Sequence, residues 1–334
     1  MNKEEILGLF EQFNQQRVLV IGDVMIDSYY WGKVERISPE APVPVVSVHN
    51  KENRLGGAAN VALNLKALGA TPIMASVVGA DHYGQLFQSL LTDLDLSNIG
   101  ISPSMERPTT VKTRIISSGQ QMIRVDEETT KYLSDQEETD LLKRINHILD
   151  HDKIDVIIFE DYNKGVLTKN LIKTIVDKAN SMGIPTTVDP KNKHFFTYKN
   201  VTLFKPNLKE LKEGLKKDFD KSDTQALENS VAELHQRLNH KISLITLSEL
   251  GVYVNDGNSS HIPAHIRNIS DVSGAGDSVI SVASLCLACQ TPTVFMAALS
   301  NLAGGLVCEK IGVVPIDKNL LLTEALKLSE TYVS

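Results

Sequence analysis

The sequence predicts an α/β fold, with a mostly parallel central sheet covered by helices on both faces and a small separate β-sheet. Along the 334 residues, short runs rich in Val, Ile and Leu alternate with amphipathic segments of helical length. The short runs are apolar almost throughout, which is typical of parallel strands buried on both faces. Two further stretches have a period of two and no helix beside them, so they favour a second sheet.

The expected elements follow in chain order. The first ten residues favour a short amphipathic helix, and Gly69 is expected to end the helix that begins near residue 58. Strands are predicted at 17–22, 73–78, 154–159, 185–188, 202–205, 242–246 and 251–255, and helices at 58–68, 82–94 and 168–181. A polar turn is expected after the first strand. The apolar region 278–307 is interrupted by Gln-Thr-Pro at 290–292, which predicts two buried helices rather than a membrane span.

The second sheet is assigned to segments without helical neighbours. Residues 41–48 and 108–118 have strand patterning, and 120–126 would be the return strand of a hairpin. We expect a lid contributed by about 28–54 and 107–127, attached to one large domain that spans 1–334.

Composition excludes several classes of protein. The formal net charge is −7, so there is no overall basic field to attract nucleic acid or anionic lipid. Acidic residues occur within the first ten residues, and no long apolar segment follows them. A signal peptide is therefore not expected, and we expect a cytoplasmic location. Cys286 and Cys289 form a C-x-x-C inside an apolar helical run, which favours core packing over redox or metal chemistry.

A glycine-rich helix start near the C-terminus is the first candidate site. Asp271-Val-Ser-Gly-Ala-Gly-Asp277 directly precedes an apolar helical pattern. Small residues and unpaired first-turn N–H groups, at Gly274, Ala275 and Gly276, favour an anion. A carboxylate at Asp277 beside that anion suits a general base that takes a proton from a hydroxyl attacking phosphorus. The alternative is that Asp271 or Ser273 merely caps the helix.

A second glycine-led helix start lies near the N-terminus. Gly56 and Gly57 precede a helix whose first turn contains Asn60, and Asp27 follows the first strand. Backbone amides, an Asn amide and a carboxylate suit the hydroxyls of a polyol at the carboxyl edge of the sheet. For each residue alone, a turn or cap role is the alternative.

The order and separation of these two elements resemble the two signatures of the ribokinase-like (PfkB) carbohydrate kinase family, and the resemblance covers essentially the whole chain. Family members often have two Thr where this chain has Val272-Ser273, and Ser keeps the second hydroxyl. The resemblance implies a sugar kinase that uses ATP and Mg²⁺. It also implies a homodimer formed through the lid.

The resemblance implies roles at further positions. Asn207 and Glu210 match the N-x-x-E motif that organises Mg²⁺ and phosphate through water, although a capping box explains them equally well. Thr246, Ser248 and Gly251 fall where the family contacts the nucleotide, and Asn301 falls near the expected adenine pocket. No Walker motif or dinucleotide fingerprint is present.

Longer segments resemble heptose-7-phosphate kinases. These are 22–32, 36–46, 120–126, 161–165 and 188–191. They imply phosphorylation at O1 of D-glycero-β-D-manno-heptose 7-phosphate, within ADP-heptose synthesis for lipopolysaccharide core. Many such kinases are fused to an adenylyltransferase domain, whose H-x-G-H-type sequence does not occur here, so the kinase step alone is expected.

A phosphorylated acceptor needs cations remote from Asp277. The lid segments offer Lys112, Arg114 and Arg124, each of which could equally be a solvated surface charge. The loops after two strands offer Asp161 and Lys164 for the sugar, and Lys191 for ATP. Ordinary loop positions are the alternative for the two lysines.

Three competing functions remain open at this stage. The first is another kinase of the family, acting on ribose, fructose, a nucleoside or a fructose phosphate. The second is a non-catalytic sugar or nucleotide sensor on the same fold, against which the retained Asp277 argues. The third is an NAD-dependent dehydrogenase, which lacks support because the dinucleotide fingerprint is missing.

Overall fold

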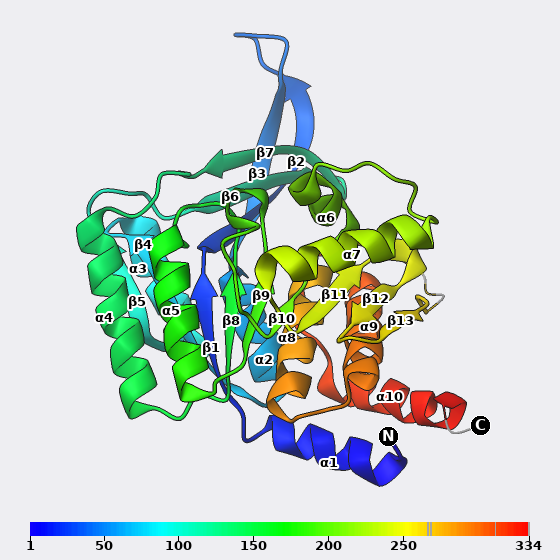
Figure 1. Cartoon of the computed structure of the whole chain (residues 1–334). Coiled ribbons are helices and arrows are strands. Elements are labelled where there is room, and N and C mark those ends of the chain that lie inside the picture. Colours follow the sequence, from blue (N-terminus) through cyan, green and yellow to red (C-terminus); the bar gives the residue numbers. More distant parts are fainter. Residues whose placement is uncertain (266, 268, 311, 333–334) are drawn as a thin grey trace.

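The computed structural model describes residues 1–265, 267, 269–310 and 312–332, and is shown in Figure 1. A central sheet of nine strands has the order β13-β12-β11-β10-β9-β8-β1-β4-β5. Its strands are β1 (Arg17–Gly22), β4 (Thr71–Gly79), β5 (Ser97–Ser104), β8 (Val156–Glu160), β9 (Thr186–Asp189), β10 (Leu203–Phe204), β11 (Ile242–Thr246), β12 (Val252–Asn255) and β13 (Ser259–Ile262).

The pairing confirms the predicted mostly parallel sheet. β1 lies between β4 and β8, with Val20 opposite both Met74 and Ile158. Among the described strands of this sheet, only β12 runs in the opposite direction, pairing antiparallel with β11 and with the edge strand β13. β5 and β13 were not predicted, because β5 is half exposed and β13 consists mainly of polar residues.

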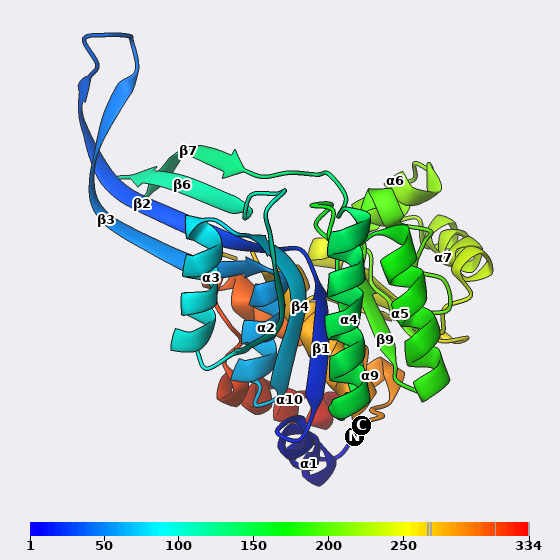
Figure 2. The same cartoon turned by 90° about the vertical axis from the view of Figure 1, so that its left-hand side faces the viewer.

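Helices cover both faces of the sheet, as Figures 1 and 2 show. They are α1 (Lys3–Phe13), α2 (Ala58–Ala67), α3 (His82–Asp93), α4 (Asp135–His151), α5 (Lys169–Met182), α6 (Leu208–Leu215), α7 (Thr224–Leu238), α8 (Ala275–Ala288), α9 (Thr293–Cys308) and α10 (Lys318–Tyr332), with short 3₁₀ turns at Asn192–His194 and Ser248–Leu250. Val18 and Val20 of β1 join the core under α1, α2, α8 and α9, whereas Leu19 and Ile21 join the core under α4, α5 and α7. Alternate residues of a strand point to opposite faces, so each buried strand supplies both cores.

The second sheet contains four strands in the order β3-β2-β6-β7. These are β2 (Val24–Ile37), β3 (Pro44–Gly57), β6 (Val111–Ser117) and β7 (Gln120–Glu127). The β2–β3 hairpin projects well beyond the body of the molecule (Figure 2). The predicted separate sheet is confirmed, but the polar turn expected after β1 is wrong. Only Asp23 separates β1 from β2, because β2 begins at Val24, which already pairs with Gly57 of β3.

Two sequence interpretations of the apolar C-terminal region are confirmed. The region 278–307 lies mainly in two helices, α8 and α9, and both contribute to the core. Cys286 is fully buried in α8 and Cys289 is half-buried near its end, both as free thiols. Burial raises the pKa of the Cys289 thiol to about 11, which disfavours the reactive thiolate. Within the described part of the chain, no helix is long and apolar enough to cross a membrane.

Candidate active site

Asp277 lies in the first turn of α8. The helix begins after Gly274, whose φ of 79° is in the left-handed region that glycine tolerates best. Both carboxylate oxygens of Asp277 accept hydrogen bonds from side chains of other elements. Asn60 Nδ2 donates to Oδ2 at 2.5 Å, and Tyr162 Oη donates to Oδ1 at 2.9 Å. The two glycine-led helix starts, 217 residues apart in sequence, therefore meet at one carboxylate.

The approach of α2 to this point depends on Gly57. Gly57 is the residue before α2, with φ of 62°, and a Cβ there would lie 2.4 Å from the carbonyl oxygen of Asp23. The amide of Ala58 donates to the same carbonyl at 3.0 Å. The chain can turn into α2 this closely to β1 only without a side chain, and the turn brings the buried Asn60 to Asp277.

Charged residues from the ends of neighbouring strands surround Asp277. Glu160 ends β8, Asp189 ends β9, and Lys205 follows β10; all three are buried. Lys205 Nζ lies 2.8 Å from Asp189 Oδ2. The carboxyl ends of parallel strands meet at one edge of a sheet, so the topology gathers these charges.

Burial decides the protonation equilibria in this cluster. It raises the pKa of the Asp277 carboxyl above its ordinary value, and the charge of Asp189 adds to this, while Asn60, Tyr162 and Lys205 oppose it. Burial and then Asp189 and Asp277 raise the pKa of Glu160 well above its ordinary value. Burial alone would lower the pKa of Lys205, but Asp189 and other carboxylates outweigh it, so its pKa is raised and the ammonium is favoured.

One face of the lid sheet carries two rows of charged and aromatic side chains. The first row, across β3-β2-β6-β7, is Arg54, Asp27, Lys112 and Asp126, and the second is Glu52, Tyr29, Arg114 and Arg124. Arg114 Nη1 donates to Asp27 Oδ1 at 2.6 Å. The predicted lid residues therefore share one face, which we call the charged lid face.

Lys112 differs from the other cations of the charged lid face. Arg54 pairs with Glu52, Arg114 with Asp27, and Arg124 with Asp126. Among the described residues, no carboxylate lies within ion-pair distance of the Lys112 ammonium. Burial lowers its pKa and the charge of Lys164 lowers it further, so an anion bound here would be stabilised.

The loop after β8 carries the predicted residues Asp161 and Lys164. Lys164 Nζ lies 2.6 Å from Glu128 and near Lys112. Asp161 lies elsewhere: its carboxylate is 1% exposed and accepts from Tyr198 Oη at 2.9 Å and from the amide of Asn163 at 2.8 Å. Burial, followed by the charge of Asp23, raises the pKa of Asp161 to about 7. The structure does not bring Asp161 to the charged lid face, because its oxygens shape the loop.

Asn207 and Glu210 form a capping box, which is one of the two roles that the sequence allowed for them. Asn207 Oδ1 accepts from the amide of Glu210 at 2.8 Å, and the amide of Asn207 donates to Glu210 Oε2 at 2.9 Å. The other oxygen of Glu210 pairs with Lys191, whose pKa is raised by Asp189 and Glu210 against the opposing effect of burial. The predicted ATP-side residues Lys191, Asn207 and Glu210 are thus in one contact network.

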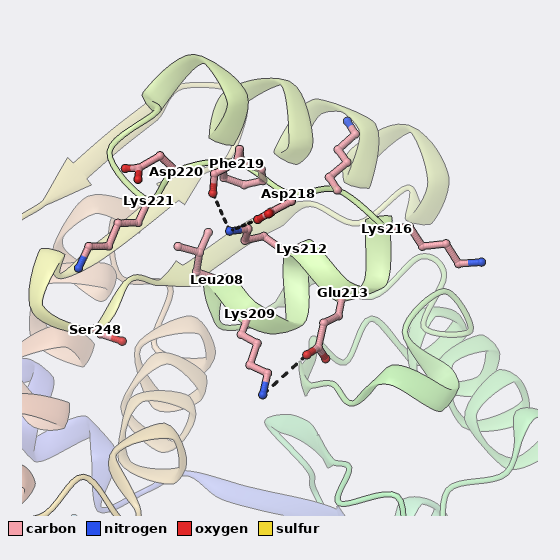
Figure 3. A pocket seen from close by; sticks show the side chains of 11 residues that line it. Leu208, Lys209, Lys212, Glu213, Lys216, Asp218, Phe219, Asp220, Lys221 and Ser248 are labelled. Atoms are coloured by element: carbon pink, nitrogen blue, oxygen red, sulfur yellow. Dashed lines mark hydrogen bonds and ion pairs between the residues drawn. The ribbon is translucent and has the colours of Figure 1, made fainter.

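The remaining predicted nucleotide residues lie around β11 and α9. Thr246 ends β11, Ser248 begins a 3₁₀ turn, and Gly251 precedes β12. Asn301 of α9 donates to the carbonyl of Pro263 at 2.9 Å. Ser248 also lines an open cavity of about 900 Å³. Figure 3 shows the side chains that line it. It is lined mainly by α6 and the segment 216–221, and neither Asp277 nor the charged lid face contributes to it.

Sequence reasoning missed several residues that contact Asp277 or organise its surroundings. These are Asp23, Glu160, Tyr162, Asp189 and Lys205, of which Tyr162 touches Asp277 directly. For Asp23, Glu160, Asp189 and Lys205 the signal in the sequence is a polar residue directly after, or at the end of, an apolar strand, whereas Tyr162 lies two residues beyond β8. That signal identifies the edge of the sheet, but it does not say which strands are neighbours.

Mg²⁺ is the metal that the family resemblance implies for this site. Among the described residues, no group of three or more His, Cys, Asp and Glu side chains could hold a metal. Mg²⁺ commonly keeps several waters and is bound by substrate phosphates with one or two carboxylates. Both oxygens of Glu210 have protein partners, so this carboxylate fits a water-mediated contact.

The fold and this site define a carbohydrate kinase of the ribokinase-like type. The family model described as pfkB family carbohydrate kinase matches residues 15–319. The chain therefore belongs to the pfkB family of carbohydrate kinases, and the predictions of family, fold and enzyme class are confirmed.

Individual proteins support the same placement. The chain is 38% identical to the bifunctional protein HldE of Syntrophotalea carbinolica over 314 residues, 93% of this chain and 63% of that protein. It is 40% identical to the bifunctional protein HldE of Methylobacillus flagellatus over 302 residues, 90% of this chain and 61% of that protein. The chain thus spans less than two thirds of the length of these relatives.

Solved structures share the fold. Phosphofructokinase-2 from Escherichia coli, in complex with potassium, has a TM-score of 0.76 at 18% identity, covering 94% of this chain and 99% of that one. Arabidopsis thaliana ribokinase, complexed with ribose and ATP, has a TM-score of 0.69 at 15% identity, covering 93% and 99%. At these identities the likeness concerns the fold alone.

Proposed function

We propose that this protein is an ATP-dependent sugar kinase that phosphorylates O1 of D-glycero-β-D-manno-heptose 7-phosphate, giving the 1,7-bisphosphate for ADP-heptose and lipopolysaccharide core synthesis. The observation that carries the kinase activity is Asp277, a buried carboxylate at the start of α8. The choice of sugar is supported by the segments that resemble heptose-7-phosphate kinases and by the similarity to the HldE proteins.

Asp277 is the proposed general base. It accepts the proton of the sugar hydroxyl while that oxygen attacks the terminal phosphorus of ATP in line. Within the described residues, each carboxylate oxygen accepts one hydrogen bond, which leaves a lone pair on each for the substrate. The sugar hydroxyls are assigned to Asp27, Asn60 and the backbone at Gly56 and Gly57.

The first turn of α8 is the proposed anion hole. Within the described chain, the amides of Gly274 and Gly276 have no acceptor, whereas that of Ala275 donates to the carbonyl of Val272 at 3.3 Å. Free first-turn amides and the helix dipole stabilise negative charge on the transferring phosphoryl group. Gly274 and Gly276 therefore carry more of this role than Ala275.

The phosphate of the acceptor is assigned to the charged lid face. Lys112 is its central cation, because it is half-buried and unpaired within the described chain. Lys164 and Arg114 flank it, and both are already paired with carboxylates. Arg124 is more exposed and forms an ion pair with Asp126, so we assign it to the edge of this phosphate-binding surface.

The ATP side is assigned to Lys191, Asn207 and Glu210, with Thr246, Ser248, Gly251 and Asn301 toward the nucleoside. Mg²⁺ would neutralise charge on the ATP phosphates, and Glu210 would contact it through water. Lys191 pairs with Glu210, so its ammonium is held where it can also contact a phosphate.

We further propose that residues 1–334 act as one kinase domain in the cytoplasm and that two copies pair through the lid. β7 is exposed along its whole length, and Met122, Ile123 and Val125 are each about half exposed. The part of β2 beyond Gly32 pairs with β3 alone among the described strands. A two-stranded ribbon is marginally stable in water by itself, which supports a partner for it.

Measuring ADP release tests the proposal. The acceptors are heptose 7-phosphate, ribose, fructose and fructose 6-phosphate, each with ATP and Mg²⁺. We expect kcat/KM for heptose 7-phosphate to exceed that for ribose and fructose by about 10²-fold or more, because the lid would bind its phosphate, and also to exceed that for fructose 6-phosphate. A preference for ribose, fructose or fructose 6-phosphate would indicate another kinase of the family. No ADP with any acceptor would indicate a sensor.

A further inference from the structure

Tyr162 holds the oxygen of Asp277 that Asn60 leaves free. Its hydroxyl donates to Oδ1 at 2.9 Å while Asn60 donates to Oδ2 at 2.5 Å. Two donors from different elements therefore fix the rotation of one carboxylate. Tyr162 comes from the loop after β8, whereas Asn60 comes from α2. Without the phenol, the carboxylate plane would have one anchor instead of two.

The loop that carries Tyr162 is tied down by Asp23. The buried Asp23 carboxylate accepts three backbone hydrogen bonds, from Tyr162 and Lys164 at 2.9 Å and from Val166 at 3.0 Å. The backbone of Asp23 also accepts from Ala58 at the start of α2. This one residue between β1 and β2 therefore connects the loop of Tyr162 with the helix of Asn60.

We propose that Tyr162 is a positioning residue for the phosphoryl-transfer base, and that Asp23 positions Tyr162. The phenol orients the Asp277 carboxylate and favours its ionised form, in which it can accept the substrate proton. This inference rests on the proposed role of Asp277. It assigns a part in catalysis to a residue that has no contact with ATP in the proposed mechanism.

The charges around Asp277 make the phenol important. Glu160 of β8 and Asp189 of β9 face the site as further carboxylates, and Lys205 after β10 is the opposing cation. Burial raises the pKa of Asp277, and Tyr162 is one of the groups that lower it. Burial and the Asp277 charge raise the pKa of Tyr162 well above 10.0, so the phenol stays a donor throughout the working range.

The test compares Tyr162→Phe with Tyr198→Phe. The second variant removes a hydrogen bond of the same kind and length, from a buried phenol to the carboxylate of Asp161. In Tyr162→Phe we expect the acid limb of the kcat profile to move up by about one pH unit, because the ionised base has lost a donor. KM for ATP should stay within about twofold. Tyr198→Phe should leave the acid limb unchanged, whatever it does to Tm.

A readout that needs no turnover separates this inference from the proposed function. In protein labelled with ¹³C-aspartate, the Asp277 carboxyl is assigned by its absence in Asp277→Asn and is titrated by NMR. Tyr162→Phe should raise its pKa by about one unit, and Asp23→Asn should raise it without adding to the effect of Tyr162→Phe. An unchanged titration in Tyr162→Phe overturns the inference even if the enzyme is active. A shifted titration in a protein that transfers no phosphate would overturn the proposed function alone.

Discussion

At the scale of single residues, the site centres on the buried carboxylate of Asp277, which neighbouring groups help to keep ionised. Burial favours protonation of Asp277, whereas Asn60, Tyr162 and Lys205 favour its ionised form. A carboxylate with a raised pKa accepts a proton more readily than an exposed Asp. As the pH falls, it also becomes protonated at a higher pH, and the protonated form cannot act as a base.

The first prediction concerns the base itself. Asp277→Asn keeps the shape of the side chain but removes the proton acceptor, so kcat should fall by about 10²–10⁴-fold. The dissociation constant for ATP, measured by calorimetry, should change little. Asp223→Asn is the matched control, because Asp223 caps α7 on the surface and Asn caps equally well. Turnover of Asp277→Asn close to the wild-type rate would exclude Asp277 as the base.

At the scale of elements, two helix starts and a sheet face build the site. α2 and α8 begin at glycines with positive φ, and both present their first turns to the same point. The lid contributes side chains from all four of its strands in register, so its cations act as a surface rather than singly.

Gly57→Ala tests the start of α2. The new Cβ would meet the carbonyl of Asp23 at 2.4 Å and the backbone would stay at a positive φ. We expect the free energy of unfolding in urea to fall by about 3 kcal/mol or more, and kcat to fall as Asn60 moves. Gly183→Ala isolates the effect of the positive φ on stability, since Gly183 has φ of 70° and open space around it. This variant should lower the free energy of unfolding by about 1 kcal/mol and leave kcat unchanged. Equal decreases in the free energy of unfolding of the two variants would show that the contact with Asp23 is unimportant.

Lys112→Ala tests the charged lid face. Because Lys112 is the half-buried cation assigned to the acceptor phosphate, its loss should raise KM for the sugar phosphate about tenfold or more. KM for ATP should be unaffected. Lys51→Ala removes a cation from the opposite face of the lid, where Lys51 contacts the ring of Tyr30, and should leave both constants unchanged. An equal rise in KM for the sugar phosphate in the two variants would indicate that the lid attracts the anion by its overall charge and not through Lys112.

At the scale of the whole molecule, the sheet divides the chain into two cores and a projecting lid. The cores are continuous and apolar, so they account for the stability of the body. Only the base of the lid joins these cores among the described residues, through Ile26, Leu55 and Val111. Farther out, the lid exposes Ile123 and Val125, and its hairpin extends beyond the other strands (Figure 2).

The proposed pairing through the lid predicts a dimer in solution. Light scattering coupled to gel filtration should give twice the chain mass of 36.8 kDa at micromolar concentration. Ile123→Lys should shift the protein toward the monomer, because a buried lysine would oppose the contact. Leu94→Lys, at an exposed position on the body, is the control and should not change the mass. A wild-type monomer would rule out the pairing.

The stability of the body should depend on pH through His240. Burial, with a smaller effect of His235, lowers the pKa of His240 from 6.5 to about 3. Between these values the unfolded chain binds a proton that the folded protein excludes. The free energy of unfolding should therefore fall as pH decreases from 6.5, by up to about 1.4 kcal/mol per pH unit from this group. His240→Phe should flatten the slope in urea melts, whereas His82→Gln, on the surface, should not. An unchanged slope in His240→Phe would assign the dependence to other groups.

Sequence patterns alone determined the class of fold and the two glycine-led helix starts, and they led to the proposal of Asp277 as the base, since each depends on local residues and their spacing. They also offered Lys112, Arg114 and Arg124 as cations of the lid segments, although only the strand register shows that these side chains share one face. They could not identify Tyr162 or Asp23, whose partners are more than a hundred residues away. Nor could they show that Asp161 turns toward Tyr198, or that Glu210 pairs with Lys191. Only the order of strands in the sheet decides which loops are neighbours, and that order sets which polar groups share the buried space around Asp277.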